Sequence, residues 1–256
     1  MGKDAGINSI VRAIDILELY GHHERELGIS EIARRLNLYK STVHRIVATL
    51  EKKDILEQNR DTGKYRLGLK LYKIGITARD GNELIAISMP HLKELTRRTG
   101  ETSNLVVMDG SMSMYLAQEE SSRMVRMFTR VGARVLPHCN GAGKVLLAQM
   151  PQDQLEAVIA ENGLKEYTKN TIRRREDLIR ELKEVREKGF AVDNQEREEG
   201  VKCIAAGVKN RTGRVVAAVS ISGPVDRFGD NRMGELVEMV KKCAASISTE
   251  LGYIGD

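Results

Sequence analysis

Apolar side chains near the start of the chain recur every three or four residues, which is the spacing of amphipathic helices. The spacing predicts a helix over residues 9–21, a second helix that begins at Ser30, and a third helix over 40–53. We expect Asn8 or Ser9 to cap the first helix and Ser30 to cap the second, because their side-chain oxygens accept hydrogen bonds from first-turn amides. The predicted core stripe of the first helix consists of Ile10, Ala13, Ile14 and Leu17.

The third predicted helix has an apolar face and a face rich in hydrogen-bond donors. Such a polar face suits a helix that enters the major groove of DNA, where side chains meet base edges and phosphates. Looser alternation over 56–67 predicts a basic β-hairpin after this helix. We expect bases to be read by Ser41, Thr42, His44 and Arg45, and phosphates to be neutralised by Lys40, Lys52, Arg60, Lys64 and Arg66.

Beyond the hairpin, helical and strand-like patterns alternate, which predicts an α+β domain over a mostly antiparallel sheet. The parts expected are a DNA-binding domain over 1–67, a linker helix over 68–82 and a second domain over 83–256. The strands predicted in the second domain are 103–108, 114–118, 124–129, 189–192, 201–208 and 215–222. Its predicted helices are 141–150, 152–161, 175–188 and 233–251, after a helix that ends near Thr99.

Charge supports a nucleic-acid partner for the front of the chain. The net charge of the whole sequence is +5, but residues 34–73 alone hold 11 Lys and Arg against 4 Asp and Glu, a local excess of +7. A phosphate backbone is the expected partner for such an excess. Aromatic residues make up 4% of the sequence and Trp is absent, so a surface that stacks single-stranded bases is disfavoured and duplex DNA is the expected ligand.

The remaining composition indicates a cytoplasmic protein without a membrane segment. Cys139, Cys203 and Cys243 are far apart and lack C-x-x-C spacing, so neither a disulfide framework nor a zinc finger is indicated. No charged-then-apolar leader opens the sequence, and no apolar run approaches the length of a membrane span. We expect no cofactor.

Two predicted strands of the second domain carry small residues on one face. In one of them Ser220 and Ser222 share a face with Val216 and Ala218, and in another Cys203 shares a face with Val201 and Ala205. We expect these faces to line a compact cavity for a small metabolite. Gly141-Ala142-Gly143 precedes a helix, whose first amides would attract a carboxylate; a plain loop-to-helix turn fits the sequence equally well.

Several short motifs, taken together and in order, identify a family resemblance. They are SIVRA (9–13), KSTVHR (40–45), KYRLG (64–68), GAGKVLLA (141–148), DNQE (193–196) and VSISGP (219–224). The set resembles the IclR family of bacterial transcriptional regulators over nearly the whole chain. The resemblance implies a winged helix-turn-helix, a linker helix, a GAF-like effector-binding and oligomerisation domain, homodimers or dimers of dimers, double-stranded operator DNA as partner, and no enzymatic activity.

The resemblance also implies a site and a function. In similar proteins the matched positions contact a small acid; these are Gly141, Ala142, Asp193, Cys203, Ser220 and Ser222, with Met124 and Met127 in an apolar patch beside them. We expect a repressor of a carbon-catabolic operon that responds to a keto or hydroxy acid such as glyoxylate or pyruvate. An activator of aromatic-acid degradation, responding to an aromatic carboxylate, is the alternative. The family commonly has Ser or Pro where this chain has Tyr39, which could contact a phosphate but is expected to pack.

Two other functions remain open at the level of sequence. Cys203, His138 and Asp193 are the residue types of a Cys-dependent hydrolase, although no nucleophile motif accompanies them. His138, Cys139 or His91 could bind zinc, although scattered single ligands are weak evidence for a metal site. We therefore expect neither catalysis nor a metal.

Overall fold

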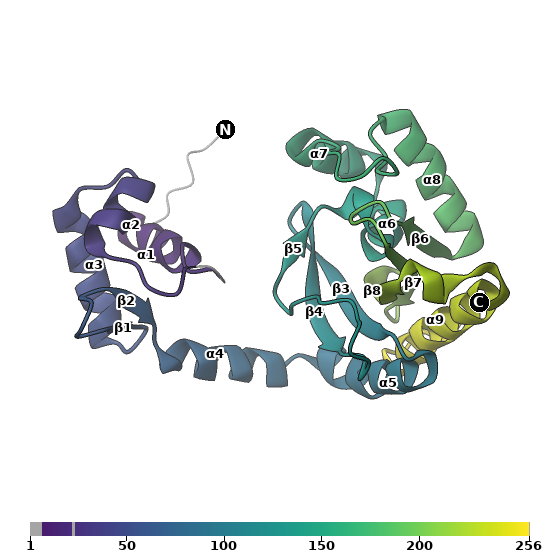
Figure 1. Cartoon of the computed structure of the whole chain (residues 1–256), viewed down its shortest axis with the longest axis horizontal. Helices are drawn as coiled ribbons and strands as arrows, with labels where there is room; N and C mark the ends of the chain where they lie inside the picture. Colours follow the sequence, from purple (N-terminus) through teal and green to yellow (C-terminus); the bar gives the residue numbers. More distant parts are fainter. Residues whose placement is uncertain (1–6, 22–23, 256) are drawn as a thin grey trace. The chain divides into compact units, whose positions relative to one another are not determined.

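The computed structural model describes residues 7–21 and 24–255, and the chain divides into two compact units between Gly81 and Asn82 (Figure 1). Each unit has its own buried apolar cluster. The elements of the first unit are α1 (Asn8–Glu18), α2 (Ile29–Arg35), α3 (Lys40–Lys52), β1 (Leu56–Gln58), β2 (Tyr65–Leu67) and α4 (Leu69–Asp80). The helix predicted in the linker is therefore present as α4, and none of its residues is buried.

The core of the first unit forms where α1, α2 and α3 meet the hairpin. Ile16, Ile32, Val43 and Val47 are fully buried, and Leu56 at the start of β1 closes the cluster. The stripe predicted for α1 is only partly correct, because Ile10 and Ile14 are 55% and 50% exposed. The apolar surface of α1 is wider than α2 and α3 can cover, so part of it is left outside this core.

Both predicted helix caps are wrong. Helix α1 begins at Asn8 itself after Ile7, and α2 begins at Ile29 after Gly28, with no side-chain cap at either start. Asn8 and Ser30 thus lie inside the first turn, where their side chains no longer occupy the capping position. Extended backbone at Ile7 and Gly28 is sufficient to start both helices.

The predicted hairpin is confirmed. Strands β1 and β2 pair antiparallel, with Leu56 opposite Leu67 and Gln58 opposite Tyr65. Leu27, just before α2, adds a backbone bridge to Tyr65. This contact, which the sequence did not suggest, attaches the hairpin to the loop that leads into the helix-turn-helix.

The second unit contains one antiparallel sheet of six strands in the order β5-β4-β3-β8-β7-β6 (Figure 1). The strands are β3 (Thr102–Asp109), β4 (Met112–Glu119), β5 (Arg134–Val135), β6 (Phe190–Asn194), β7 (Val201–Lys209) and β8 (Val215–Pro224). The helices are α5 (Glu83–Thr99), η1 (Pro137–Cys139), α6 (Gly141–Ala148), α7 (Gln152–Asn162), α8 (Arg175–Lys188), η2 (Val225–Phe228) and α9 (Asp230–Glu250).

Helices cover both faces of this sheet. On one face Leu105, Val219 and Ile221 pack with residues of α5 and α9. On the other face the alternating neighbours Val106 and Ala218 pack under α6 and α8. Burial on both sides explains why the central strands read as nearly continuous apolar and small residues. The α+β prediction is confirmed.

The strand predicted over 124–129 is wrong, because this segment has no regular secondary structure. Its backbone carbonyls bond side chains instead: Thr102 Oγ1 donates to the carbonyl of Met127 at 3.2 Å, and Arg227 donates to that of Val125 at 2.9 Å. The sheet edge beside β4 is taken by the short strand β5. None of the helices in 7–21 and 24–255 is long and apolar enough to cross a membrane.

Candidate functional site

The exposed face of α3 carries the residues predicted to read DNA. Val43 and Val47 are fully buried and fix the opposite face of the helix against the core. Thr42 is half-buried beside them. The exposed members of the predicted set on this helix are Lys40, Ser41, His44, Arg45 and Lys52.

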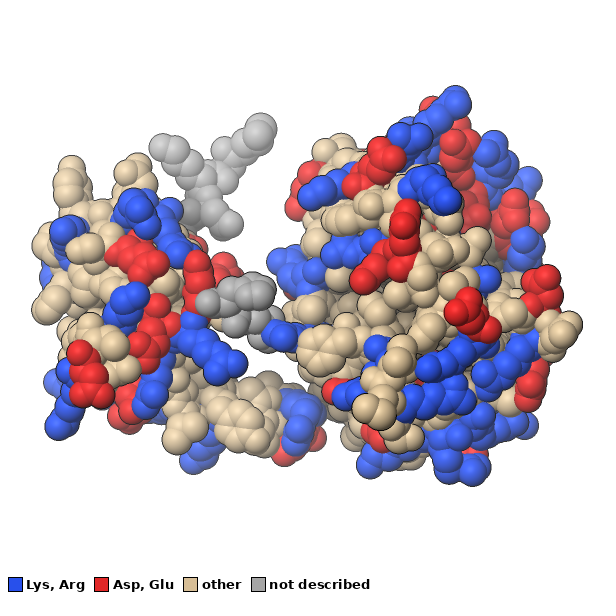
Figure 2. Space-filling model, in the orientation of Figure 1, with Lys and Arg blue, Asp and Glu red and all other residues tan. Residues whose placement is uncertain are grey.

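Ion pairs divide the predicted phosphate contacts into two groups. Arg66 pairs with Glu57 at 2.9 Å, and Lys64 lies 3.9 Å from Glu31. Figure 2 accordingly shows acidic and basic side chains intermixed on the visible face of the first unit. Among the described residues that were predicted to contact DNA, the Lys and Arg side chains without such a partner are Lys40, Arg45, Lys52 and Arg60.

The tip of the hairpin is held by Glu26. Its carboxylate accepts hydrogen bonds from Asn59 Nδ2 at 2.8 Å and from Thr62 Oγ1 at 3.1 Å. These hydrogen bonds lower the pKa of Glu26, and the bond from Asn59 has the larger effect. Arg60 lies between the two anchored positions, so its backbone is fixed while its side chain is exposed.

Tyr39 does not pack as expected. It stands immediately before α3, its side chain makes no capping bond, and it is 85% exposed. The expectation that Tyr39 packs is therefore wrong, and its ring is exposed to solvent directly before α3.

A polar patch occupies part of one face of the sheet in the second unit. Antiparallel pairing sets Cys203 opposite Ser222 on one side and opposite Asp193 on the other. Two residues back along β8, Ser220 pairs with Asn104 of β3. Directly paired residues in neighbouring strands point to the same face, so these five side chains form one surface, named here the polar patch.

Helix α6 begins against this patch. A Cβ placed on Gly141 would lie 3.3 Å from Cys203 Sγ, and the Gly141 amide donates to that sulfur. Asn140 caps the helix by accepting a hydrogen bond from the Gly143 amide at 2.6 Å. In the described part of the chain the Ala142 amide has no hydrogen-bond acceptor. A polar donor thus remains unused beside the patch.

Asn104 supplies a second unused donor. The residue is fully buried, and its Oδ1 accepts hydrogen bonds from Thr129 Oγ1 at 2.7 Å and Gln118 Nε2 at 3.1 Å. Its Nδ2 is buried without a partner. A buried amide without an acceptor costs free energy, so an acceptor brought by a ligand would be favoured there.

Asp193 has an unusual ionisation equilibrium. Burial raises the pKa of its carboxyl to about 7, although hydrogen bonds from the amides of Glu196 and Arg197 oppose the rise. Near neutral pH the group can therefore accept hydrogen bonds or, when protonated, donate one. Burial also raises the pKa of the Cys203 thiol to about 11, so this sulfur is not an activated nucleophile.

Behind the patch, Lys144 of α6 is fully buried. Its ammonium lies 2.6 Å from Glu196, 2.8 Å from Glu181 and 2.6 Å from the carbonyl of Val192. Burial alone would lower the pKa of Lys144, but the two carboxylates outweigh burial and raise it. The ion cluster ties α6 to α8 and to the segment after β6.

The predicted apolar patch lies at the margin of this site. Met127 is half-buried and its carbonyl binds Thr102, the neighbour of Ser222 across the sheet. Met124 is 97% exposed, so the structure does not bring its side chain to the polar patch. The two residues sit on an irregular segment rather than on the expected strand.

Sequence reasoning missed Asn104, Lys144 and Arg197. Asn104 stands out as polar in an apolar strand, but β3 and β8 are far apart in sequence and only their pairing reveals its neighbours. Lys144 resembles an ordinary surface lysine. Arg197, half-buried beside Asp193, lies in a segment without periodicity.

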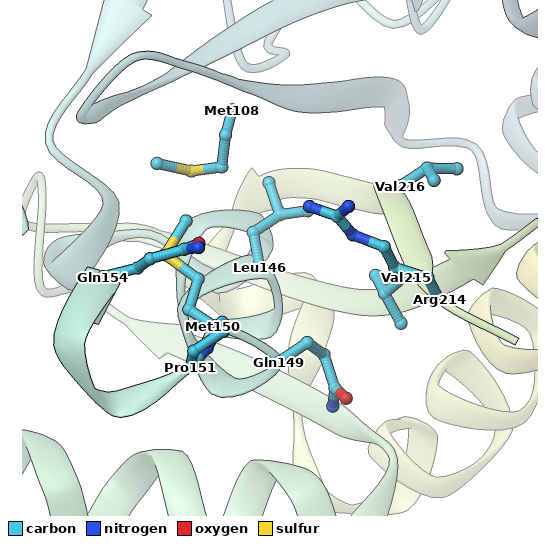
Figure 3. A pocket seen from close by; sticks show the side chains of 9 residues that line it. All are labelled: Met108, Leu146, Gln149, Met150, Pro151, Gln154, Arg214, Val215 and Val216. Atoms are coloured by element: carbon cyan, nitrogen blue, oxygen red, sulfur yellow. The ribbon is translucent and has the colours of Figure 1, made fainter.

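A separate groove of ≈ 570 Å³ lies at the other end of α6 (Figure 3). Leu146 and Met150 form part of its floor, and the Arg214 side chain extends across it (Figure 3). No residue predicted to bind the effector lines this groove. The proposed ligand residues are instead packed, with Asp193, Ser220 and Ser222 only 4%, 1% and 6% exposed.

The residues considered for zinc do not form a metal site. His91 of α5 contacts Glu250 at 2.7 Å, whereas His138 and Cys139 belong to η1. Within 7–21 and 24–255, no three His, Cys, Asp or Glu side chains are arranged to hold a metal ion.

Two protein-family models match the chain: the IclR helix-turn-helix domain over residues 9–60 and the bacterial transcriptional regulator IclR C-terminal domain over residues 77–249. Their order is that of the two units, and together they cover most of the sequence. The chain belongs to the IclR family of DNA-binding transcriptional regulators. The resemblance seen in the sequence is confirmed.

Individual IclR relatives match along almost the whole chain. The regulator KdgR of Escherichia coli (strain K12) is 36% identical over 247 residues, 96% of this chain and 94% of KdgR. The repressor AllR of the same strain is 32% identical over 96% of this chain and 91% of AllR. An IclR homologue from Microbacterium hydrocarbonoxydans, solved in complex with 4-hydroxybenzoate, has a TM-score of 0.84 and 27% identity over 95% of this chain and 98% of that chain.

These IclR families and relatives are regulators, so the expectation that the chain is not an enzyme is confirmed. The raised pKa of Cys203 agrees with the absence of hydrolase activity, because a cysteine hydrolase needs a thiolate near neutral pH. The alternative built on Cys203, His138 and Asp193 is therefore dropped.

Proposed function

We propose that this IclR regulator represses a carbon-catabolic operon and that a small keto or hydroxy acid, bound at the polar patch, controls its affinity for operator DNA. The observation that carries the proposal is the unpaired, fully buried Nδ2 of Asn104 beside Ser220, at the end of the sheet face where α6 begins. Repression is supported by similarity to AllR, which is named a repressor.

The chemistry of the patch fits a small, oxygen-rich anion. Asn104 Nδ2 and the Ala142 amide offer two unused donors, and the hydroxyls of Ser220 and Ser222 can donate to further oxygens. Asp193 can accept a hydrogen bond from a ligand hydroxyl or hydrated carbonyl. Cys203 supplies a small surface between them. We propose Gly141 and Ala142, at the positive end of α6, as the place of the carboxylate.

An aromatic carboxylate is the second candidate. The homologue from Microbacterium hydrocarbonoxydans was solved with 4-hydroxybenzoate, and this chain resembles it over nearly its full length. Against this candidate stands the close packing at the polar patch: Cys203, Ser220 and Ser222 are buried, so a ring needs more rearrangement there than an acid of two or three carbons does. Comparing binding of glyoxylate, pyruvate and 4-hydroxybenzoate separates the two candidates.

For the DNA contact we propose α3 as the reading helix. Base edges would meet Ser41, Thr42, His44 and Arg45, and phosphates would meet Lys40, Lys52 and Arg60. Lys64 and Arg66 contribute less, because each already has a carboxylate nearby. Tyr39, exposed at the start of the helix, adds a phosphate contact through its hydroxyl.

We also propose that the chain acts as a homodimer or a dimer of dimers. The support is an uncovered apolar stripe on α1, where Ile10, Val11 and Ile14 are 55%, 46% and 50% exposed, continued by Ile7 just before the helix at 66%. A second copy could bury this stripe, and a two-fold arrangement would require a palindromic operator. Sedimentation of the variant Ile10→Asp/Ile14→Asp tests this step, since a monomer is expected.

The test of the effector site is binding of small acids to the purified full chain by calorimetry. We expect glyoxylate or pyruvate to bind the unmodified protein, and we expect Ser222→Ala to weaken that binding while leaving operator affinity unchanged. As a matched control, Ser246→Ala changes a half-buried serine on α9, away from the patch. Equal affinity of the acid for Ser222→Ala and the unmodified protein would contradict the assignment.

A further inference from the structure

Arg197 is a half-buried cation for which the fold provides no counter-ion. Its guanidinium carbon lies 4.1 Å from the centre of the Tyr167 ring, and the side chain lies beside Cys139. Among the described residues it forms no ion pair with Asp or Glu. A partly desolvated guanidinium with only neutral partners attracts an anion.

The backbone that carries Arg197 is fixed by hydrogen bonds from a neighbouring loop. Thr168 Oγ1 donates to the carbonyl of Gln195 at 2.6 Å, and Thr171 Oγ1 donates to that of Glu196 at 2.6 Å. On the other side, the amide of Glu196 donates to Asp193 at 2.7 Å. The segment after β6 is therefore held in place, and the guanidinium is pre-positioned rather than free on a loop.

The location of Arg197 connects it to the polar patch. Cys139, which its guanidinium contacts, is the last residue of η1 and lies two residues before Gly141, where α6 begins. The Arg197 amide donates to the carboxylate of Asp193, a member of the patch. The Arg197 side chain thus lies beside the segment that leads into α6, and its backbone lies beside the polar patch.

The other ionisable groups around Arg197 leave its charge uncompensated. Burial lowers the pKa of His138 and raises the pKa of the Cys139 thiol to about 11, so both are neutral near pH 7. Burial also raises the pKa of Tyr115. The buried Lys144 is already neutralised by Glu196 and Glu181, so neither carboxylate is left for Arg197.

We infer that Arg197 is the anchor for the carboxylate of the effector, acting together with the first amides of α6, and that it restricts the site to acids. This inference rests on the proposed function and adds the residue that makes the site select a charged carboxylate over a neutral analogue of the same shape. The carboxylate meets Arg197 and Ala142, while the hydroxyl or carbonyl oxygen meets the serines and Asn104. An uncharged amide of the same shape lacks the first contact.

The test compares acids with their amides on the full chain. Pyruvate and pyruvamide, glyoxylate and glyoxylamide, and 4-hydroxybenzoate and 4-hydroxybenzamide are titrated by calorimetry into the unmodified protein and into Arg197→Gln. We expect the unmodified protein to prefer the acid over the amide by roughly ten- to a hundredfold, the range of a charge-assisted hydrogen bond. In Arg197→Gln that preference should vanish while amide binding stays unchanged, which also shows that the variant is folded.

Two further variants complete the design. Arg197→Lys keeps the charge but loses the planar fork, so we expect it to retain part of the preference. Arg214→Gln changes the guanidinium over the separate groove (Figure 3) and should leave the preference intact. Loss of the preference in Arg214→Gln but not in Arg197→Gln would overturn the inference.

Failure of the inference and failure of the proposed function give different results. If an acid binds, Ser222→Ala weakens it, and Arg197→Gln keeps the full preference for the acid, then the patch binds the effector but Arg197 is not its anchor. If no acid in the series binds the unmodified protein, both the proposed function and the role of Arg197 are overturned.

Discussion

Lys144 shows how a single residue can govern the stability of the second unit. Its ammonium is fully buried between Glu196 and Glu181. We expect Lys144→Met to lower the free energy of unfolding by about 3–5 kcal/mol, because Glu196 would remain buried without a counter-ion. Urea denaturation followed by circular dichroism measures the change.

The control for this prediction is an exposed ion pair on α8. Lys188 pairs with Glu184 at 2.6 Å at the surface, and Lys188→Met should leave the free energy of unfolding nearly unchanged, because water screens an exposed ion pair. The double variant Lys144→Met/Glu196→Gln should recover part of the stability lost in Lys144→Met, since it removes the orphaned charge. A similar small effect of both single lysine variants would contradict the account.

Asp193 predicts a pH dependence of stability. Burial raises its pKa from 3.8 to about 7 in the folded chain, so the folded state binds more protons than the unfolded state between these values. Its contribution to stability is therefore lost as the pH rises from about 4 to about 7 and stays low above that. The Asp193→Asn variant lacks this loss, so the difference between the two unfolding free energies should grow over that window. If the unfolding free energies of the unmodified protein and of Asp193→Asn change in parallel between about pH 4 and about pH 7, the pKa of Asp193 is not raised.

At the scale of elements, the junction of η1 and α6 depends on a glycine. A Cβ on Gly143 would lie 2.3 Å from the carbonyl oxygen of Pro137. Gly143→Ala should therefore destabilise the second unit by about 1–3 kcal/mol through overpacking. Gly75→Ala in α4 is the control, because no atom lies within 4 Å of its added Cβ. We expect that control to be neutral or to raise the melting temperature, and the reverse order would show that the junction tolerates a side chain.

The reading helix and the hairpin should contribute differently to DNA binding. Arg45→Ala on α3 should cost about 1–3 kcal/mol on operator DNA and relax the choice of one base, while Arg60→Ala should lower the salt slope by about one. Arg66→Ala should do less than Arg60→Ala, because Arg66 is already paired with Glu57. Isotherms over a salt series, on operator and random duplexes, measure both effects. An equal loss of salt dependence in Arg60→Ala and Arg66→Ala would contradict the distinction between unpaired and paired cations.

Local pattern was enough to predict most elements and not enough to predict their starts. The helices over 40–52 and 175–188 and the strands over 201–209 and 215–224 follow from periodicity and from small or apolar runs. The predicted caps at Asn8 and Ser30 are wrong because α1 starts one residue earlier and α2 two residues earlier than those caps require, which moves both side chains out of the capping position. The strand predicted over 124–129 is wrong because the carbonyls of this segment bond to side chains distant in sequence, those of Thr102 and Arg227, and not to a neighbouring strand.

At the scale of the whole molecule, the order of the strands in the sheet could not be predicted from the sequence. The faces of β7 and β8 were predicted from period-two alternation, and their pairing joins Cys203 to Ser222 as expected of neighbours. The position of β3 beside β8 brings in Asn104, and the turn after β6 brings in Arg197. Both additions depend on long-range topology, which no local spacing encodes.

The account as a whole requires that effector binding in the second unit and DNA binding in the first be linked. Linkage is reciprocal: an acid that weakens operator binding must itself bind less tightly to the protein on DNA. We propose that α4 carries the coupling between the two units. Because none of its residues is buried, its orientation can change without loss of core packing.

The most direct test is an operator titration by fluorescence anisotropy at fixed salt, with DNA from the regulator's own promoter, in the absence and presence of the acid that binds. The account predicts that the acid changes operator affinity of the unmodified protein by about five- to 150-fold, the usual range of allosteric coupling, and leaves that of Asp193→Ala unchanged. An acid response of the same size in Asp193→Ala, or operator affinity no higher than that for random DNA, would contradict it.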